Sequence, residues 1–82
     1  IMKFEDLLKL IDLDNKKTIH LVENNKMILD SELNKENFDL FKEFFEKTVI
    51  SIDFTTDNLY QIDDYDNYYI SDVDKIISIT IK

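Results

Sequence analysis

The sequence predicts one α+β domain, with two helices packed on one face of a small antiparallel β-sheet in the order α-ββ-α-βββ. Apolar residues recur with the 3.6-residue period of a helix in two segments and alternate with polar residues in several others. The 82 residues suffice for one domain, and no linker or repeat divides residues 1–82. Short polar segments separate the expected strands, as in an antiparallel meander.

The first half of the chain predicts a helix followed by a β-hairpin. Phe4, Leu7, Leu8 and Ile11 have helical spacing, which indicates an amphipathic helix over residues 3–12. Residues 12–17 have turn chemistry. Strands are expected over residues 17–23 and 26–30. Because the chain has no glycine, the intervening Asn24-Asn25 pair should supply the left-handed turn, which Asn tolerates better than most residues.

A second helix is expected from residue 34 or 35 to residue 47, with Ser31 or Asn34 as its cap. Its apolar stripe is aromatic and consists of Phe38, Phe41 and Phe45, widened by Leu40 and Phe44. The stripe is interpreted as the main part of the core. The alternative is a partner-binding groove lined by the phenylalanines.

The last third of the chain predicts three or four short strands, with candidates at residues 48–54, 59–62, 68–70 and 75–81. Turns are expected at residues 55–58, 63–67 and 71–74. The expected core combines both helices with this sheet: Phe4, Leu7, Leu8, Ile11, Phe38, Phe41, Phe45, Ile50, Ile52, Ile77, Ile79 and Ile81.

Composition argues against several kinds of active site. The absence of cysteine excludes disulfides, thiolate metal sites and cysteine nucleophiles, and it favours the reducing cytoplasm. The absence of glycine excludes a phosphate-binding glycine loop. His20 is the only histidine and is expected to be structural. We therefore expect no enzyme activity and no cofactor. No signal peptide and no membrane span are expected either, because no apolar run is long enough.

The acidic segment matches a calcium-binding EF-hand loop only in part. Asp64, Asp66 and Asp72 can occupy positions 1, 3 and 9 of an EF-hand loop. The sixth position is then Tyr69 instead of glycine, and the twelfth is Lys75 instead of glutamate. Both the turn residue and the bidentate ligand are missing, so no metal site is expected.

The net charge of −8 is concentrated in one third of the chain. Residues 48–74 contain no lysine and seven acids: Asp53, Asp57, Asp63, Asp64, Asp66, Asp72 and Asp74. The rest of the chain holds the other 11 acids and all 10 basic residues. Direct binding to nucleic acid is excluded by the sign of this charge. A protein of this charge can instead occupy a basic surface that holds nucleic acid.

Residues 61–74 are therefore the candidate partner-binding segment. Tyrosine is common at binding hot spots, and here it is interleaved with aspartates that can form a row along a strand. The expected contact residues are Asp63, Asp64, Tyr65, Asp66, Tyr68, Tyr69, Asp72 and Asp74. In the alternative interpretation, these aspartates only form solvated turns.

In size, charge and composition, the chain resembles small acidic inhibitor proteins encoded by phages and prophages, above all anti-CRISPR proteins. The resemblance covers general character and carries no motif in register. It implies a non-enzymatic inhibitor that acts in the cytoplasm of a bacterial host cell and binds a basic protein or ribonucleoprotein, such as a nuclease or CRISPR effector. Immunity or antitoxin proteins directed against nuclease toxins are similar in the same respects. A phage structural or assembly protein is the remaining alternative.

Overall fold

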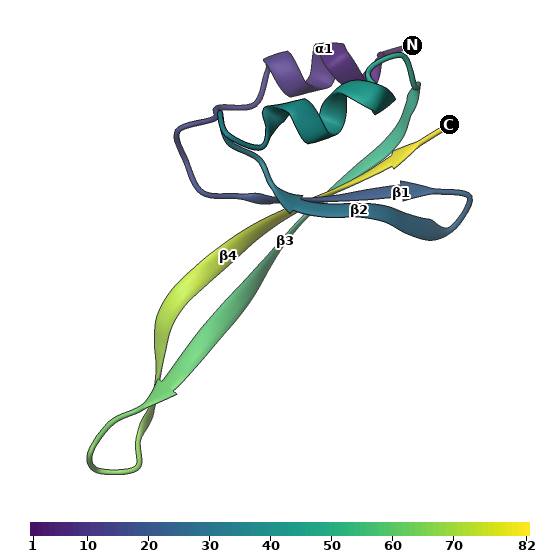
Figure 1. Ribbon diagram of the computed structural model, residues 1–82. Helices are drawn as coiled ribbons and strands as arrows, with labels where there is room; N and C mark the ends of the chain where they lie inside the picture. Colours follow the sequence, from purple (N-terminus) through teal and green to yellow (C-terminus); the bar gives the residue numbers. More distant parts are fainter.

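The computed structural model describes residues 1–82 and shows a four-stranded sheet with two short helices on one face (Figure 1). The elements in chain order are α1 (Phe4–Lys9), β1 (Thr18–Glu23), β2 (Lys26–Glu32), the 3₁₀-helix η1 (Phe38–Phe44), β3 (Val49–Ile62) and β4 (Tyr68–Ile81). The α+β class is confirmed. The observed order is α-ββ-η-ββ, because the C-terminal region forms two long strands.

The sheet is mixed, which corrects the expectation of a purely antiparallel sheet. Its strand order is β2-β1-β4-β3. The β1–β2 and β3–β4 pairs are antiparallel hairpins, whereas β1 and β4 run parallel from Thr18–Ile76 to Glu23–Ile81. Two local hairpins are thus joined side by side. The segment that contains η1 crosses over the sheet between them (Figure 1).

Both helices are shorter than expected, and the second is a 3₁₀-helix. α1 ends at Lys9, and Glu5 and Asp6 lie in its first turn, where the helix dipole favours acidic side chains. In η1, Phe38, Phe41 and Phe44 lie three residues apart. Since a 3₁₀-helix has three residues per turn, this spacing brings the three rings onto one face. The aromatic ring contacts are those of Phe41 with Phe4 and of Phe38 with Phe45.

The core lies between the two helices and the upper half of the sheet. The ring centroids of Phe4 and Phe41 are 6.3 Å apart, and both side chains are fully buried. The buried apolar residues are Phe4, Leu7, Leu8, Ile19, Leu21, Leu33, Phe41, Ile77, Ile79 and Ile81, and Ile11, Phe38, Phe45 and Ile52 pack against them half-buried.

One expected core residue, Ile50, is exposed. A register shift between Val49 and Ser51 gives β3 an extra residue there, which takes Ile50 out of the alternation. Ile19, Leu21 and Leu33 were not expected in the core. Ile19 and Leu21 are buried because they belong to β1, which is a central strand of the sheet.

The C-terminal hairpin corrects the expected meander. β3 and β4 are 14 residues each and pair antiparallel from Val49–Ile81 to Ile62–Tyr68, with two register shifts. The turns expected at residues 55–58 and 71–74 do not form. Thr55 and Thr56 are good strand formers, and at residues 71–74 the chain makes only a one-residue shift at Ser71. The turn at residues 63–67 is confirmed.

Asparagine and aspartate supply every left-handed backbone position, as the lack of glycine required. Asn24 and Asn25 have φ values of 53° and 62° in the β1–β2 turn, and Asp66 has φ 61° in the β3–β4 turn. The first hairpin thus has the backbone signs of a type I′ turn, whose twist matches the flanking strands.

Candidate protein-binding site

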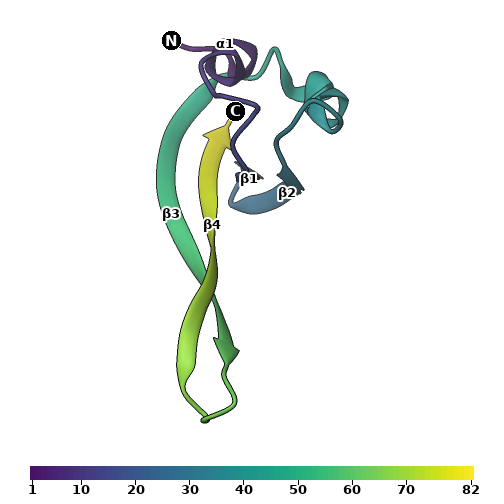
Figure 2. The same cartoon turned by 90° about the vertical axis from the view of Figure 1, so that its left-hand side faces the viewer.

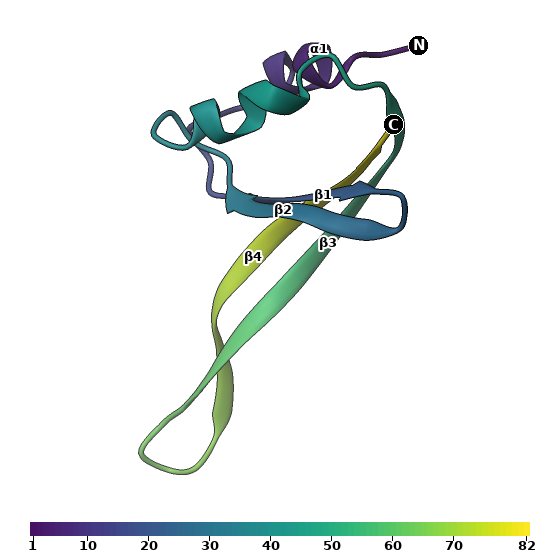
Figure 3. The same ribbon diagram turned by 45° about the vertical axis from the view of Figure 1, so that its right-hand side comes forward.

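The outer part of the β3–β4 hairpin projects from the domain as a two-stranded arm (Figures 2 and 3). We define the hairpin arm as residues 56–75, since β1 pairs with β4 only from Ile76 onward. Every arm residue except Asp74 is exposed. The arm accounts for the elongated shape of the molecule, 51 × 27 × 17 Å.

One face of the arm continues the core face of the sheet beyond the reach of the helices. Ile77 is buried and pairs with Phe54, which is 75% exposed because no helix covers it. Residues two apart on a strand share a face. The same side therefore carries exposed apolar side chains that begin at Phe54, just before the arm, and we call them the apolar face: Phe54, Tyr60, Ile62, Tyr68, Ile70 and Val73. Thr56, Asn58 and Lys75 lie on the same side near the base of the arm.

The opposite face of the arm carries aspartates, and we call Asp53, Asp57, Asp72 and Asp74 the acidic face. Asp57 lies directly opposite Asp74 in the ladder, and Asp72 lies opposite Leu59. Like charges at directly opposed positions destabilise a strand pair. Farther out, the Tyr69 hydroxyl donates a hydrogen bond to Gln61 Oε1 at 2.9 Å across the strands.

The tip of the arm is a turn organised by Asp63. The backbone N–H groups of Tyr65 and Asn67 donate to Asp63 Oδ1 at 2.8 and 3.0 Å. These bonds to Asn67 and Tyr65 stabilise the carboxylate and lower the pKa of Asp63 below its ordinary value of 3.8. Asp64 and Asp66 make no ion pair, and Tyr65 beside them is 85% exposed.

The base of the acidic face is partly neutralised by a lysine from another element. Lys16 Nζ lies 3.5 Å from Asp72 Oδ2 and 3.5 Å from Asp74 Oδ1. The charges of Asp74 and Asp72 raise the pKa of Lys16 above its ordinary value of 10.5. Residues 48–74 contain no lysine, but the fold brings Lys16 from another part of the chain beside them. The uncompensated negative charge therefore lies mainly at Asp53, at Asp57 and at the tip.

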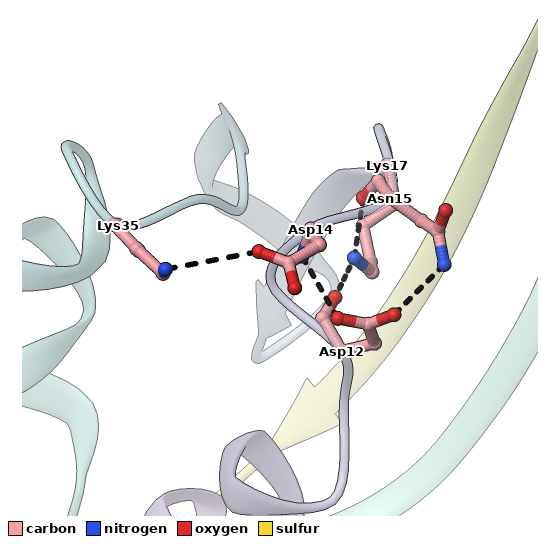
Figure 4. Close-up of polar contacts among 5 residues, drawn as sticks. All are labelled: Asp12, Asp14, Asn15, Lys17 and Lys35. Carbon is pink, nitrogen blue, oxygen red and sulfur yellow. Dashed lines mark hydrogen bonds and ion pairs between the residues drawn. The ribbon is translucent and has the colours of Figure 1, made fainter.

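The loop at residues 12–17 lies beside the base of the arm and is held by its own polar contacts (Figure 4). Asp12 accepts bonds from the Asp14 backbone N–H and the Asn15 side-chain amide, both at 2.8 Å. The buried Lys17 Nζ donates to the carbonyl oxygens of Asp12 and Asn15. This loop therefore holds Lys17 in place against the sheet.

A hollow of about 710 Å³ opens between this loop and the first residues of the arm. It is the one pocket of the structure. Its walls combine apolar and basic side chains: Phe54, Ile76, Ile77, Lys16, Lys17 and Lys75. Lys75 is exposed and makes no ion pair, so it is the free cation at this end of the arm.

The structure places all eight sequence-predicted contact residues on the arm, but it does not place them on one surface. Asp72 and Asp74 share a face, as expected from strand spacing. Asp64 and Asp66 lie in the turn, with Asp66 left-handed, so strand spacing does not apply to them. Tyr68 lies on the apolar face and Tyr69 on the opposite face.

Two further residues of the arm lie outside the expected set of contact residues. Tyr60 is 59% exposed on the apolar face, and Asp57 faces Asp74. Asp57 was hidden by the incorrect turn at residues 55–58, whereas Tyr60 lay in the strand expected at residues 59–62. The strand-forming residues Thr55 and Thr56 were the signal that could have extended that strand and placed Asp57 on it.

Other parts of the structure offer less to a ligand. His20 Nε2 lies 3.3 Å from Asp30 Oδ1 on the neighbouring strand, a cross-strand polar pair. No group of three or more His, Asp or Glu side chains is arranged to hold a metal ion. Neither helix has the length and apolar character needed to cross a lipid bilayer.

Comparison with known proteins leaves the geometry of the arm as the basis for assigning a function. No protein-family model, no curated protein and no solved structure matches the chain significantly.

Proposed function

We propose that this protein is a non-enzymatic acidic inhibitor that inserts its hairpin arm into the basic nucleic-acid-binding surface of a nuclease or CRISPR effector. The observation that carries the proposal is the projecting arm itself, which holds six aspartates and a single lysine at its base. An acidic element that stands clear of the domain can enter a groove built for nucleic acid. An acidic surface that only keeps the protein soluble does not have to project from the domain.

The shape and composition of the arm support this role. Two strands about 5 Å apart form a narrow ribbon, much thinner than a nucleic-acid duplex. Tyr65 and Tyr68 are the most exposed aromatic residues of the arm, at 85% and 74%. Tyrosine contributes large contact area at the centres of interfaces, whereas aspartates steer association toward a basic partner.

The tip is expected to contribute most to recognition, since its acids have no cation beside them. Asp63 fixes the turn through its two backbone hydrogen bonds, which presents Asp64 and Asp66 in a set conformation. A preorganised tip loses less entropy when it binds. Asp72 and Asp74 can contribute further along the arm, where cations of the partner would have to replace Lys16.

The test is a DNA-binding assay with a panel of guide-loaded CRISPR effectors and basic nucleases. Wild-type protein should displace the DNA from at least one of them, and added salt should slow the onset of inhibition. The Asp64→Lys/Asp66→Lys variant should lose inhibition by tenfold or more, about 1.4 kcal/mol. Full inhibition by this folded variant, or none by wild type across the panel, would refute the proposal.

The matched control is Glu36→Lys/Glu43→Lys. Both glutamates are exposed, neither forms an ion pair, and neither lies on the arm. The control changes the net charge by the same amount as the tip variant. It should retain inhibition, which would separate a local effect of the tip from an effect of overall charge.

A further inference from the structure

We infer that the apolar face of the hairpin arm is a dimerisation surface, occupied by the arm of a second copy of this chain in antiparallel orientation. The inference is independent of the proposed inhibitory function. It starts from the apolar face, which the helices leave uncovered. An isolated two-stranded hairpin is at best marginally stable in water, and this one exposes apolar side chains as well.

The amount of exposed surface suits a stable contact between two copies. Phe54, Tyr60 and Tyr68 are 75%, 59% and 74% exposed, and Ile62, Ile70 and Val73 are 54%, 52% and 42% exposed. Together these six side chains offer on the order of 600 Å² per copy, close to the roughly 800 Å² per partner of a standard interface. Contacts from the tip and the base add to this area.

The distribution of charge selects the orientation of the second copy. The tip carries Asp64 and Asp66 without cations, and on the apolar face the base carries Lys75 without an ion-pair partner, because the acids of the base, Asp57 and Asp74, lie on the opposite face. About 20 Å of strand separates Thr56, which pairs with Lys75, from Ile62, where β3 ends and the turn at the tip begins. With the arms antiparallel, each tip meets the other copy's base. With the arms parallel, all the tip carboxylates would meet one another, which is unfavourable.

The hollow at the base completes the match. It lies where the other copy's tip would arrive, and its walls include Phe54, Lys17 and Lys75. Its volume of about 710 Å³ is within the range of protein ligand pockets and has room for an aromatic side chain. The exposed Tyr65 at the tip is the side chain positioned to enter it. Such a contact is isologous, since each copy supplies both a tip and a base.

The middle of the apolar face then lies on the twofold axis. Tyr60 pairs with Ile70 about halfway between tip and base. In the dimer, each Tyr60–Ile70 pair packs on its counterpart. The acidic face points away from this contact. A basic partner that captured Asp64 and Asp66 would have to open the dimer.

Molecular mass in solution, measured by sedimentation equilibrium over a range of micromolar concentrations, tests the inference. Wild-type protein should be a dimer, and Ile70→Lys should be a monomer because it places two lysines together at the axis. The matched control is Leu59→Lys, on the opposite face of the same arm and 43% exposed. It should remain a dimer. A wild-type monomer throughout, or equal loss of dimer in both variants, would overturn the inference.

A charge-swap series tests the orientation. Lys75→Glu alone and Asp64→Lys/Asp66→Lys alone should each weaken the dimer by about tenfold, and the triple variant that combines them should recover most of the loss. Failure of the triple variant to recover while both parents stay folded would exclude the tip-to-base arrangement. Ile70→Lys keeps the tip acids intact, so its inhibitory activity can be scored separately from its loss of dimer.

Discussion

Asp63 shows how one side chain can set the shape of a candidate binding tip. Its carboxylate accepts the backbone N–H groups of Tyr65 and Asn67, and its own backbone N–H donates to the Asn67 carbonyl at 2.9 Å. Aspartate is the natural residue for such a turn in a chain without glycine. The sequence predicted this turn correctly. It could not show that Asp63 is occupied by the turn while Asp64 and Asp66 are free.

The lowered pKa of Asp63 makes the tip sensitive to acid. Because the folded pKa lies below 3.8, the stability that this carboxylate contributes is complete above that value and is lost as the pH falls through the lowered pKa. An NMR titration of the side-chain carboxyl carbon should give a midpoint below 3.8. Asp63→Asn should loosen the turn without unfolding the core. A midpoint at or above 3.8 would contradict the hydrogen-bonding role.

Phe41 illustrates the opposite case, a residue whose environment the sequence predicted well. It is fully buried and packs on Phe4, as the interpretation of the phenylalanine stripe as core required. Phe41→Ala should lower the free energy of unfolding by about 3–5 kcal/mol, because it leaves a cavity in a small core. Leu40→Ala, at a neighbouring residue that is 53% exposed, should change it by about 0.5 kcal/mol at most. Urea unfolding of both variants measures the difference, and comparable losses would show that Phe41 is not central.

At the scale of elements, the hairpin arm and the core sheet are expected to differ in stability. β4 is flanked on both sides from Ile76 to Ile81, whereas from Tyr68 to Lys75 it pairs with β3 alone. Backbone hydrogen bonds of an exposed ribbon open more readily than those of a covered sheet. The arm also carries the repulsive Asp57–Asp74 pair.

Hydrogen exchange measures this difference directly. In dilute, monomeric protein or in the Ile70→Lys variant, amides of residues 57–74 should exchange at least tenfold faster than those of residues 77–81. Replacing residues 57–74 by an Asn-Gly turn should leave a folded core, since no residue of the hydrophobic core lies on the arm. Loss of the cooperative unfolding transition in the shortened protein would show instead that the arm supports the fold.

The same elements show what sequence patterns can and cannot predict. The first helix, the first hairpin and its Asn24-Asn25 turn followed from periodicity and turn chemistry, which are local. The continuous 14-residue strands were missed because Thr55–Asn58 and Ser71–Asp74 have turn-like composition. In the structure, cross-strand pairing overrides this local preference, as tertiary context often does for strands.

At the scale of the whole molecule, the charge balance in the structure differs from the charge balance along the sequence. The sequence showed where the acids gather. The fold shows that Lys16 forms ion pairs with Asp72 and Asp74, whereas the acids at the tip have no cation beside them. The contact of Lys16 with Asp72 and Asp74 joins residues 56 and 58 positions apart, so no local pattern could have predicted it. The parallel pairing of β1 with β4 was missed for the same reason.

That parallel pairing also has a consequence for how the chain reaches its native state. The β1–β2 and β3–β4 hairpins can each form early, because their strands are neighbours in sequence, whereas docking β1 on β4 must close a loop of more than 50 residues. The slow step is therefore expected to be the docking of two preformed hairpins. Until it occurs, the apolar sides of Ile19, Leu21 and Ile79 stay open to other molecules. The newly made chain is thus most prone to aggregation before its last residues have joined the sheet.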